Sequence, residues 1–530
     1  MIFQNIFRYT GLVLLSGFIS CNDFLEEKPK SEMNTDQFFS SAQHAYSAVN
    51  SLYRTGVPEF YNAGSAYMGP TIMLDGYLSG FFDNEYKGQE VVILYCQNLN
   101  LTSKNSAGVM DGVWDPCYRA ISRANFAIKN IARTPGLSDT EKNQLLATAR
   151  FFRAMNYFHL VKFFGDVPLI TDPYESLDNL YVAREPSSNI YKLIIEDLIF
   201  SVENGELKDE AFTKNGFKIS KGTVQTLLAN VYLNLSGYPL QENNYANAAA
   251  VAREVINSGK YALIENGNTP ETTAYNTIRT TDDSNEYIYS IEYDATIASA
   301  GWRPTYSFPN KAATWGVFKY SITCNAYRPV DEFLNIYNPK SDLRIQEKQF
   351  FHSSFTYTKN DKEITENFIT SPYIWYNEEA MLQTGRSGKD VVVYRYPEVL
   401  LIAAEAIAKT EGVTAEAAEY LAQVKARASL NETKQEITNS LIAMNTEDFI
   451  EEIWSERLRE FPLENKVWWD IQRTRKYPKT DSNNKGFVSF INVIGAKNPW
   501  GSIYNEANLL WPISDNEIQR NPNLSQNEGY

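Results

Sequence analysis

Residues Ser138 to Gly165 read SDTEKNQLLATARFFRAMNYFHLVKFFG, and this stretch is the strongest indicator of the fold. Ser138 and Glu141 have the S-x-x-E spacing of a capping box, in which each side chain accepts a hydrogen bond from the backbone N–H of the other residue. Apolar residues then recur at helical spacing as far as Phe163, and Gly165 marks a stop. The sequence therefore predicts one long helix with both ends marked.

The same periodicity predicts further helices on both sides of this one. They cover Cys117 to Ile131, after a turn and an early proline at residues 114–116, and then residues 220–235, 245–259, 398–406, 414–428 and 446–462. Two pairs, 220–259 and 398–428, have about the length of a tetratricopeptide repeat, with alanines where packed helices need close approach. The predicted fold class is mainly α, with tetratricopeptide-like helix pairs as the scaffold.

Two long irregular segments, residues 57–105 and 262–392, interrupt the helical pattern. The second contains short β-like runs at 287–293 and 391–394, with Trp302, Tyr306, Trp315, Tyr327 and Trp375 scattered along it. Long loops of this kind inside a compact domain are usually functional. We therefore expect one unit over residues 21–530, with helical scaffold at about 30–56, 106–261 and 393–475 and loop-rich, ligand-binding parts between.

Composition excludes several functions. The 530 residues include 49 Lys plus Arg against 64 Asp plus Glu, which gives a net charge of −15, and 34 Tyr and 29 Phe. Affinity for nucleic acid comes from Lys and Arg displacing counterions, so an acidic chain is a poor candidate for that partner. The aromatic surplus suits positions that are half wet and half apolar.

The N-terminus predicts export. An apolar run at Gly11 to Ser20 is too short to span a bilayer, and Phe18-Ile19-Ser20-Cys21 is similar to a bacterial lipobox. We expect residues 1–20 to be a lipoprotein signal peptide and Cys21 to be the lipidated N-terminus, with a plain cleaved signal as the alternative. Lipid chains on Cys21 would anchor the protein stably without a membrane-spanning helix.

Neither the other cysteines nor the histidines form a recognisable site. Cys96, Cys117 and Cys324 are widely separated and have no CxxC pair, so free buried thiols are expected. The three histidines, His44, His159 and His352, have no metal-ligand spacing. A calcium-like run at 481–492 fails because Lys485 occupies a ligand position. We therefore expect no metal, no cofactor and no catalytic residue.

Aromatic rings beside planar polar groups in the irregular segments are typical of sugar binding. The apolar faces of sugar rings stack on aromatic rings, and their hydroxyls need partners such as Asn, Asp and Arg. The alternative is that each ring fills the core below its loop. The candidate ligand residues are Tyr77, Phe81, Phe82 and Asp83 in the first segment and Trp302, Arg303, Tyr306 and Trp315 in the second.

Six separated motifs resemble the SusD/RagB family, the surface nutrient-binding lipoproteins of Bacteroidetes. The motifs are Ser20 to Pro29, Asp115 to Asn125, Ala149 to Thr171, Tyr394 to Ala406, Glu456 to Arg473 and Leu510 to Tyr530. The last of these, residues 510–530, resembles the C-terminal signature of the family. The sequence departs from the family at Leu463 to Lys466, where Glu-Gly-His-Arg is more usual. We interpret the motifs as scaffold, in which Trp468 and Trp469 bury ring area and Arg395, Glu398 and Arg457 neutralise one another.

The resemblance implies a SusD-like fold with four tetratricopeptide-like helix pairs and a non-catalytic function. The protein would be lipid-anchored at the outer membrane, face the exterior, and deliver an oligosaccharide to a SusC-like TonB-dependent transporter. A RagB-like protein that captures peptides or glycopeptides is the alternative from the same scaffold. A glycoside hydrolase is a remote third hypothesis, because no feature of the sequence selects a pair of carboxylates.

Overall fold

The computed structural model describes residues 39–61, 64–65, 67–174, 180–296, 303–319, 323–385 and 387–530. The predicted signal peptide, the predicted lipidation site Cys21 and the candidate ligand residue Trp302 lie outside the described residues.

The described residues form mainly helices joined by short antiparallel strand pairs. The helices are α3 (Ala42–Asn50), α4 (Val57–Phe60), α5 (Leu74–Leu78), α6 (Val91–Gln97), α7 (Ala107–Ile131), α8 (Asp139–Phe164), α9 (Ser187–Glu203), α10 (Lys221–Ser236), α11 (Tyr245–Asn257), α12 (Ala274–Thr280), α13 (Asp331–Leu334), α14 (Tyr396–Glu411), α15 (Ala415–Ala428), α16 (Lys434–Ile442), α17 (Thr446–Glu460), α18 (Val467–Thr474) and α19 (Asp515–Arg520). The strand pairs are β1 (Gly64–Ser65) with β2 (Gly69–Pro70), β3 (Phe82–Asp83) with β7 (Arg328–Pro329), β4 (Val167–Pro168) with β5 (Arg184–Glu185), β6 (Tyr287–Ile291) with β10 (Val391–Arg395), β8 (Phe351–Lys359) with β9 (Lys362–Pro372), and β11 (Lys476–Thr480) with β12 (Val488–Asn492). The predicted fold class, mainly α with short β elements, is confirmed.

Helix α8 begins and ends where its sequence predicts. The Glu141 N–H donates to Ser138 Oγ at 3.2 Å, and the Ser138 N–H donates to Glu141 Oε2 at 2.8 Å. The helix ends before Gly165, whose φ of +70° is unfavourable for residues with a side chain. Much of its C-terminal half is buried all round, as expected for a helix at the centre of a core.

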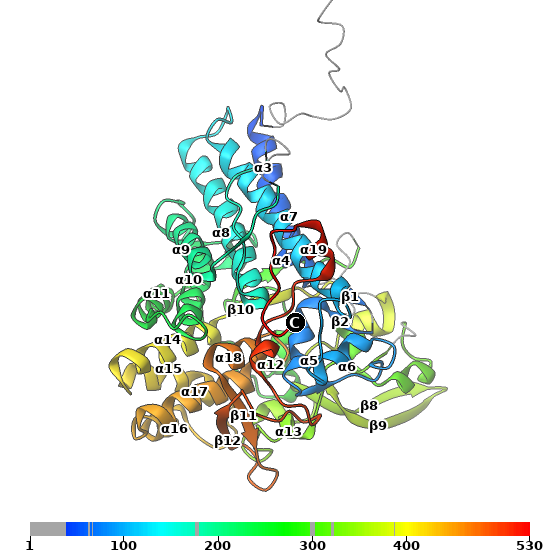
Figure 1. Cartoon of the computed structure of the whole chain (residues 1–530). Coiled ribbons are helices and arrows are strands. Elements are labelled where there is room, and N and C mark those ends of the chain that lie inside the picture. The colour runs from blue at the N-terminus through cyan, green and yellow to red at the C-terminus, as the bar shows by residue number, and fades with distance from the viewer. Residues whose placement is uncertain are drawn as a thin grey trace, which may run out of the picture.

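The predicted helix pairs form one side of the molecule. Helix α10 packs on α11, α14 packs on α15, and α11 joins the two pairs by packing on α14. Figure 1 shows these pairs following one another on the left, from the cyan α8 to the orange α17. The pairs at 220–259 and 398–428 are therefore where the sequence places them.

Helix α7 corrects one expectation. The turn predicted at residues 114–116 is helical, because α7 starts at Ala107 and contains Pro116 in its interior. A proline inside a helix costs about 3 kcal/mol. Met110, Val113 and Trp114 are buried on the extra turns, and each buried apolar side chain contributes about 1.5–3 kcal/mol. Burial of these three side chains outweighs the missing hydrogen bond.

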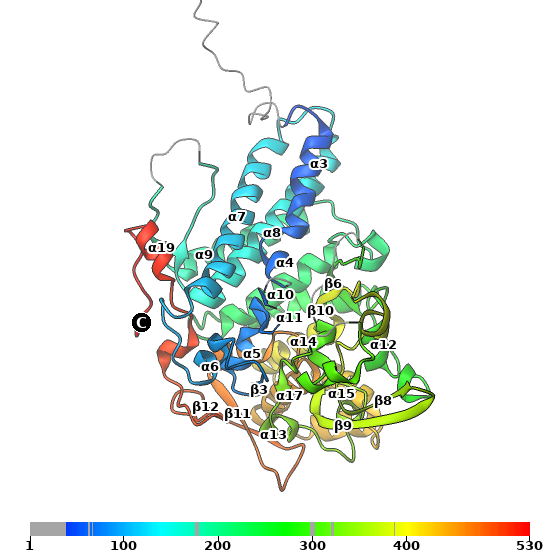
Figure 2. The same cartoon turned by 90° about the vertical axis from the view of Figure 1, so that its right-hand side faces the viewer.

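The two irregular segments meet in space. Strand β3 of the first pairs with β7 of the second, with Phe82 opposite Pro329 and Asp83 opposite Arg328. The two β-like runs predicted in the second segment, at 287–293 and 391–394, correspond to β6 and β10 and pair with each other. The hairpin β8–β9 projects from this side of the molecule (Figures 1 and 2).

The C-terminal segment returns to the end of α8. The Trp511 N–H donates to the Phe163 carbonyl at 2.7 Å, and the Asn527 side-chain amide donates to the Phe164 carbonyl at 3.0 Å. A continuous hydrophobic core includes buried residues from Phe39 to Leu524. Trp468 and Trp469 belong to this core, as predicted for the scaffold motifs.

A network of buried ion pairs connects the helical scaffold to the irregular segments. Arg395 Nη1 lies 2.6 Å from Glu286 Oε1 and 3.0 Å from Glu460 Oε1, and the Arg427 guanidinium bridges the same two carboxylates. All four side chains are at most 4 % exposed. The positive charges hold the pKa of Glu460 below its ordinary value, although burial alone would raise it.

The expected neutralisation of Arg395 by Glu398 is wrong. Arg395 pairs with Glu286, Glu460 and Glu464, whereas Glu398 pairs with Lys466 at 2.9 Å and more weakly with Arg457 at 3.8 Å. Glu464 and Lys466 belong to the stretch where the sequence departs from the family pattern. This stretch therefore supplies its own ion pairs to the scaffold.

Two other expectations concern cysteines and membranes. Cys96, Cys117 and Cys324 are buried and form no disulfide with one another, as predicted. Within the part of the chain that the structure describes, no helix is both long enough and apolar enough to cross a lipid bilayer.

We predict that Arg427→Met lowers the free energy of unfolding by about 3–5 kcal/mol, because the substitution leaves buried carboxylates with fewer compensating charges. The measurement is chemical denaturation followed by circular dichroism. The matched control is Lys434→Met, which removes the exposed pair with Glu419 and should cost less than about 1 kcal/mol. Equal costs for the two variants would show that the network does not stabilise the fold.

Candidate functional site

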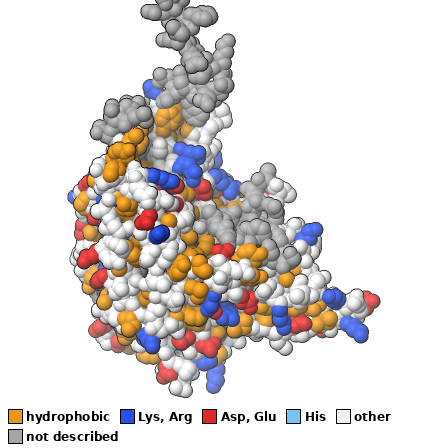
Figure 3. Space-filling view, turned by 45° about the vertical axis from the view of Figure 1, so that its right-hand side comes forward, with side chains coloured by type: hydrophobic (Ala, Val, Ile, Leu, Met, Phe, Trp, Pro, Cys, Tyr) orange, Lys and Arg blue, Asp and Glu red, His pale blue; other side chains and the backbone are white. Residues whose placement is uncertain are grey.

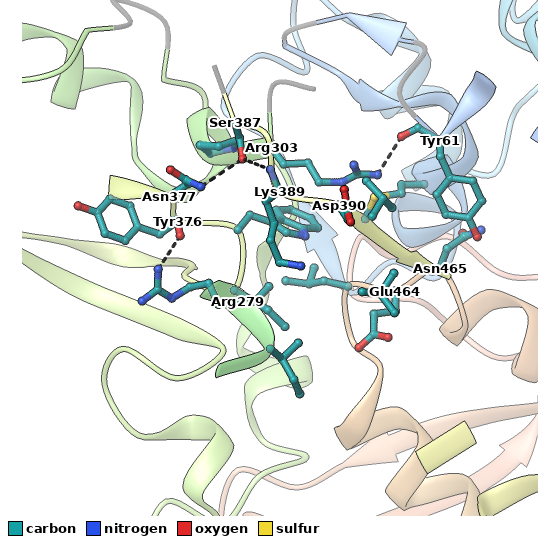
Figure 4. A pocket seen from close by; sticks show the side chains of 18 of the residues that line it. Tyr61, Arg279, Arg303, Tyr376, Asn377, Ser387, Lys389, Asp390, Glu464 and Asn465 are labelled. Atoms are coloured by element: carbon teal, nitrogen blue, oxygen red, sulfur yellow. Dashed lines mark hydrogen bonds between the residues drawn. The ribbon is translucent and has the colours of Figure 1, made fainter. Parts of the chain in front are cut away.

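A cavity lies where both irregular segments meet the helical scaffold. Its volume is about 100 Å³. Its wall combines Tyr61 after α4, Arg279 of α12, Arg303 at the start of a 3-10 helix, the loop 374–377 after β9, the residues leading into β10, and the loop 463–465 between α17 and α18. Figure 4 shows these side chains converging from separate parts of the chain.

Trp375 provides the largest aromatic surface on this wall. The side chain is half-buried, and two buried tyrosines hold it from the protein side. The Tyr306 ring lies edge-to-face with it at a centroid distance of 5.9 Å, and the Tyr327 ring does so at 5.7 Å. An aromatic ring fixed in this way can stack on the apolar face of a sugar at little entropic cost.

Two arginines on the wall are held by neutral acceptors. Arg303 Nη2 donates to the Tyr61 carbonyl at 2.8 Å. Arg279 Nη1 donates to the Tyr376 carbonyl at 2.7 Å, and its Nε donates to Asn276 Oδ1 at 3.0 Å. Burial lowers the pKa of both guanidinium groups, yet arginine stays charged in proteins. Both arginines therefore bring a positive charge to the cavity.

A group of carboxyls lies beside these arginines. Asp390 Oδ1 accepts a hydrogen bond from the Tyr293 N–H at 2.7 Å, and Lys389 Nζ lies 2.6 Å from Asp282 Oδ1. Burial and the neighbouring Asp390 raise the pKa of Glu292 to about 8. Burial, with the charge of Asp282, raises the pKa of Asp390 to about 6. The pair Glu292–Asp390 therefore retains protons close to neutral pH.

The structure places most of the predicted ligand side chains in the core. Tyr77, Phe81, Phe82, Asp83, Tyr306 and Trp315 are each at most 5 % exposed. Arg303 is the described member of the predicted set that lines the cavity. In this arrangement the rings fill the core below their loops and do not form an open stacking platform. Core filling is the alternative that the sequence leaves for each ring.

The contacts of the buried rings explain their placement. Tyr77 stacks on Tyr327 at 4.6 Å, and Phe81 stacks on Tyr477 at 5.3 Å. Asp83 is neutralised by Lys87 and Arg328. These residues join the first irregular segment to its neighbours.

Trp315 fills a separate small core beneath the projecting hairpin. The cluster contains Phe308 and Met381, and Trp315 stacks on Phe355 of β8 at 6.1 Å. Its ring supports the hairpin, so a large aromatic residue in an irregular segment is not by itself evidence of a ligand.

Sequence reasoning missed Trp375 as a candidate. Trp375-Tyr376-Asn377 has the same mixture of aromatic and planar polar residues that selected Phe81 to Asn84. The same criterion, applied to residues 375–377, selects Trp375 as a candidate. It could not have ranked Trp375 above Trp315, because exposure depends on which distant rings pack behind each one.

Two larger cavities fit a ligand site less well. One of about 400 Å³ beside α15 and α17 is lined by Arg344, Glu456 and Arg459, which already pair with each other. The other, of about 450 Å³, runs between α7 and α19 and contains the exposed Tyr174 and Tyr181. This groove between α7 and α19 has exposed aromatic rings and is therefore the alternative location for a ligand.

Comparisons with known proteins match nearly the whole chain. A family model described as "SusD family" matches residues 340–530, and one described as "Starch-binding associating with outer membrane" matches residues 23–233. The chain is 26 % identical to the SusD-like protein P2 of Formosa agariphila over 543 residues, which covers 99 % of each chain. It is 24 % identical to SusD-like protein P38 of the same organism, over 100 % of this chain and 99 % of that one.

Solved structures show the same fold. A SusD superfamily protein from Parabacteroides distasonis superposes with a TM-score of 0.78 at 27 % identity and covers 94 % of this chain and 100 % of its own. Surface glycan-binding protein A from Bacteroides uniformis superposes with a TM-score of 0.68 over 92 % of this chain and 99 % of its own. The second is 18 % identical, so its likeness shows the fold alone.

We predict that the Glu292–Asp390 pair makes the protein less stable as pH rises. Unfolded carboxyls lose their protons near pH 4, whereas the folded pair keeps them to about 6 and about 8, so stability falls with rising pH over this window. Asp390→Asn should reduce the fall in melting temperature between about pH 5 and about pH 8.

The control for this prediction is Asp283→Asn. Asp283 is exposed, and Lys214 and Thr213 lower its pKa, so it is already ionised over the same range. This variant should keep the wild-type pH dependence. An unchanged slope in Asp390→Asn would show that the pair titrates normally.

Proposed function

Because the chain belongs to the SusD family, we propose that it is a surface glycan-binding protein that captures oligosaccharides without breaking a bond. Capture would take place at the cavity beside Trp375, with the sugar ring on the aromatic face and polar side chains at its hydroxyls. The starch-binding description of the matching family model and the surface glycan-binding relatives of the same fold support this proposal.

The observation that carries the proposal is the position of Trp375. This half-buried ring lines a cavity at the junction of the two irregular segments, next to Arg303 and Asn377. Loops on a rigid scaffold are the usual place for binding residues.

The two alternative functions receive less support from the cavity. A RagB-like peptide-binding protein with an acidic surface would favour basic peptides, yet this cavity is lined by two arginines that form no ion pair with any described carboxylate. For hydrolysis, two carboxyls must flank the scissile bond about 5–9.5 Å apart. The two carboxyls on the wall are already engaged, because Asp390 shares a hydrogen bond with Glu292 and Glu464 pairs with Arg395.

The proposal includes the cellular context that the family resemblance implies. Lipidated Cys21 would hold the protein at the outer face of the outer membrane, and a SusC-like TonB-dependent transporter would receive the ligand. The description of the family model as associating with the outer membrane supports this location. An acidic, folded body on a lipid anchor fits this arrangement without a membrane-spanning helix.

We predict that Trp375→Ala lowers the affinity for the bound oligosaccharide by about tenfold, because the variant loses ring stacking and the associated apolar burial. Isothermal titration calorimetry with oligosaccharides selected on a polysaccharide panel provides the measurement. Two control variants should keep the wild-type affinity. Trp454→Ala removes a half-buried tryptophan that packs on Phe490 of β12, away from the cavity.

The second control, Tyr181→Ala, tests the groove between α7 and α19. A loss of affinity in Tyr181→Ala with none in Trp375→Ala would move the binding site to that groove. Loss in neither variant would contradict aromatic capture at both places.

We predict that the full-length protein fractionates with the outer membrane and that Cys21→Ala abolishes this fractionation, because the variant has no lipidation site. Mild detergent extraction of the wild type should recover a complex with a TonB-dependent transporter, identified by mass spectrometry. Membrane retention of Cys21→Ala would contradict the lipid anchor, and recovery of the free protein alone would contradict the stable complex.

A further inference from the structure

The charge of the cavity wall is opposite to that of the protein. The chain carries a net charge of −15, and on the face drawn in Figure 3 acidic and basic side chains are interspersed. The cavity wall includes four cationic side chains, those of Arg279, Arg303, Lys389 and Arg395, against two acidic ones. A local excess of positive charge in an acidic protein requires an explanation.

Two of the four cations are neutralised by the fold. Arg395 pairs with buried Glu286 and Glu460 and with Glu464 at the wall. Lys389 pairs with Asp282 at 2.6 Å. Their positive charges are compensated and have a structural role.

Arg303 and Arg279 have no such compensation. Neither forms an ion pair with a carboxylate of the described residues, and their hydrogen bonds go to carbonyl and amide oxygens. Glu378 contributes to the field at Arg279, but it is exposed and lies beyond ion-pair distance. Among the described residues, the hydrogen bond of the Arg303 guanidinium is the one from Nη2 to the Tyr61 carbonyl.

Asp390 and Glu292 weaken the positive field less than two ordinary carboxylates would. Their raised pKa values mean that the pair holds a proton at neutral pH and carries less than its full negative charge. In Figure 4 the Arg303 guanidinium and Arg279 stand on either side of Lys389, and the Arg279 guanidinium lies beside Tyr376, to which it donates. Both arginines line the cavity, and neither is paired with a carboxylate of the described residues.

We infer that the captured oligosaccharide is acidic, and that Arg303 and Arg279 bind its carboxylate or sulfate groups. This inference rests on the proposed glycan capture at the same cavity. Guanidinium groups match the planar oxygens of carboxylates and the oxygens of sulfates, and such charge-assisted hydrogen bonds are about twice as strong as neutral ones. The cavity, of about 100 Å³, is small, so we place one acidic substituent in it while the sugar ring rests on Trp375.

The experiment compares acidic oligosaccharides with neutral partners of equal length by calorimetry. The carboxylate arm uses oligogalacturonides against galacto-oligosaccharides, and the sulfate arm uses carrageenan oligosaccharides against their desulfated forms. We expect the acidic member of at least one arm to bind at least tenfold more tightly than its neutral partner. Added salt should weaken only the acidic member.

Substitutions then assign the effect to the two arginines. Arg303→Gln and Arg279→Gln should each reduce the affinity for the acidic member about tenfold and leave the neutral partner within about twofold. Arg303→Lys keeps the charge and should recover part of the loss. The matched control is Arg119→Gln, an exposed arginine paired with Glu59 on α4, which should bind as the wild type does. Circular dichroism checks that each variant is folded.

The outcomes separate this inference from the proposed function. The inference is overturned if, in both arms, the neutral oligosaccharides bind as tightly as the acidic ones. If Trp375→Ala then still lowers the affinity, the proposed glycan capture remains supported. Equal losses for acidic and neutral members in Arg303→Gln would also overturn the inference. Binding of no oligosaccharide in either arm, acidic or neutral, would contradict glycan capture and the inference together.

Discussion

The buried ion pairs of Arg395 and Arg427 with Glu286 and Glu460 are the constraint on which the structure depends. The four residues come from β10, from α15, from the residue before β6 and from α17, so the network crosses from the helical scaffold into the irregular segment. Removing a charge from water is costly unless a partner compensates it, so each member holds the others in place. Arg395 also binds Glu464, and both line the cavity, so the network extends to the cavity wall.

Local features of the sequence could be predicted, and long-range partners could not. The cap at Ser138 and the stop at Gly165 act within one helical turn, and the structure follows both. The turn predicted before Pro116 is wrong because the cost of a proline inside a helix is about 3 kcal/mol. This cost is smaller than the free energy gained by burying the apolar side chains that precede it. For Arg395 the sequence offered Glu398 as an acidic neighbour, yet its partners Glu286 and Glu460 are 109 and 65 residues away. No periodicity or motif predicts an ion pair between residues so far apart in the sequence.

The candidate site illustrates the same limit for aromatic residues. Composition and loop position pointed to the irregular segments, and the structure brings residues of both segments together at one cavity. Which ring faces that cavity depends on what packs behind it: Phe355 and Tyr357 cover Trp315, whereas Tyr306 and Tyr327 hold Trp375 at the wall. Of the predicted ligand residues, the structure brings Arg303 to the wall, and it was selected for its planar donors and its position in the loop.

The net charge affects the approach of a ligand at long range, and the local charge of the site affects its affinity. A charge of −15 keeps the protein soluble and slows the approach of an anionic polymer at long range. Screening at physiological salt limits that repulsion to about 8 Å, so affinity depends on the charges that touch the ligand. Carboxylates neutralise Arg395 and Lys389, so the positive charge of the cavity reduces to Arg303 and Arg279. Among the described residues these two arginines donate to carbonyl and amide oxygens, and Arg279 also lies over the rings of Tyr373 and Tyr376. An acidic protein can therefore have a cationic site. The positive charge is confined to Arg303 and Arg279 because Arg395 and Lys389 are paired with carboxylates.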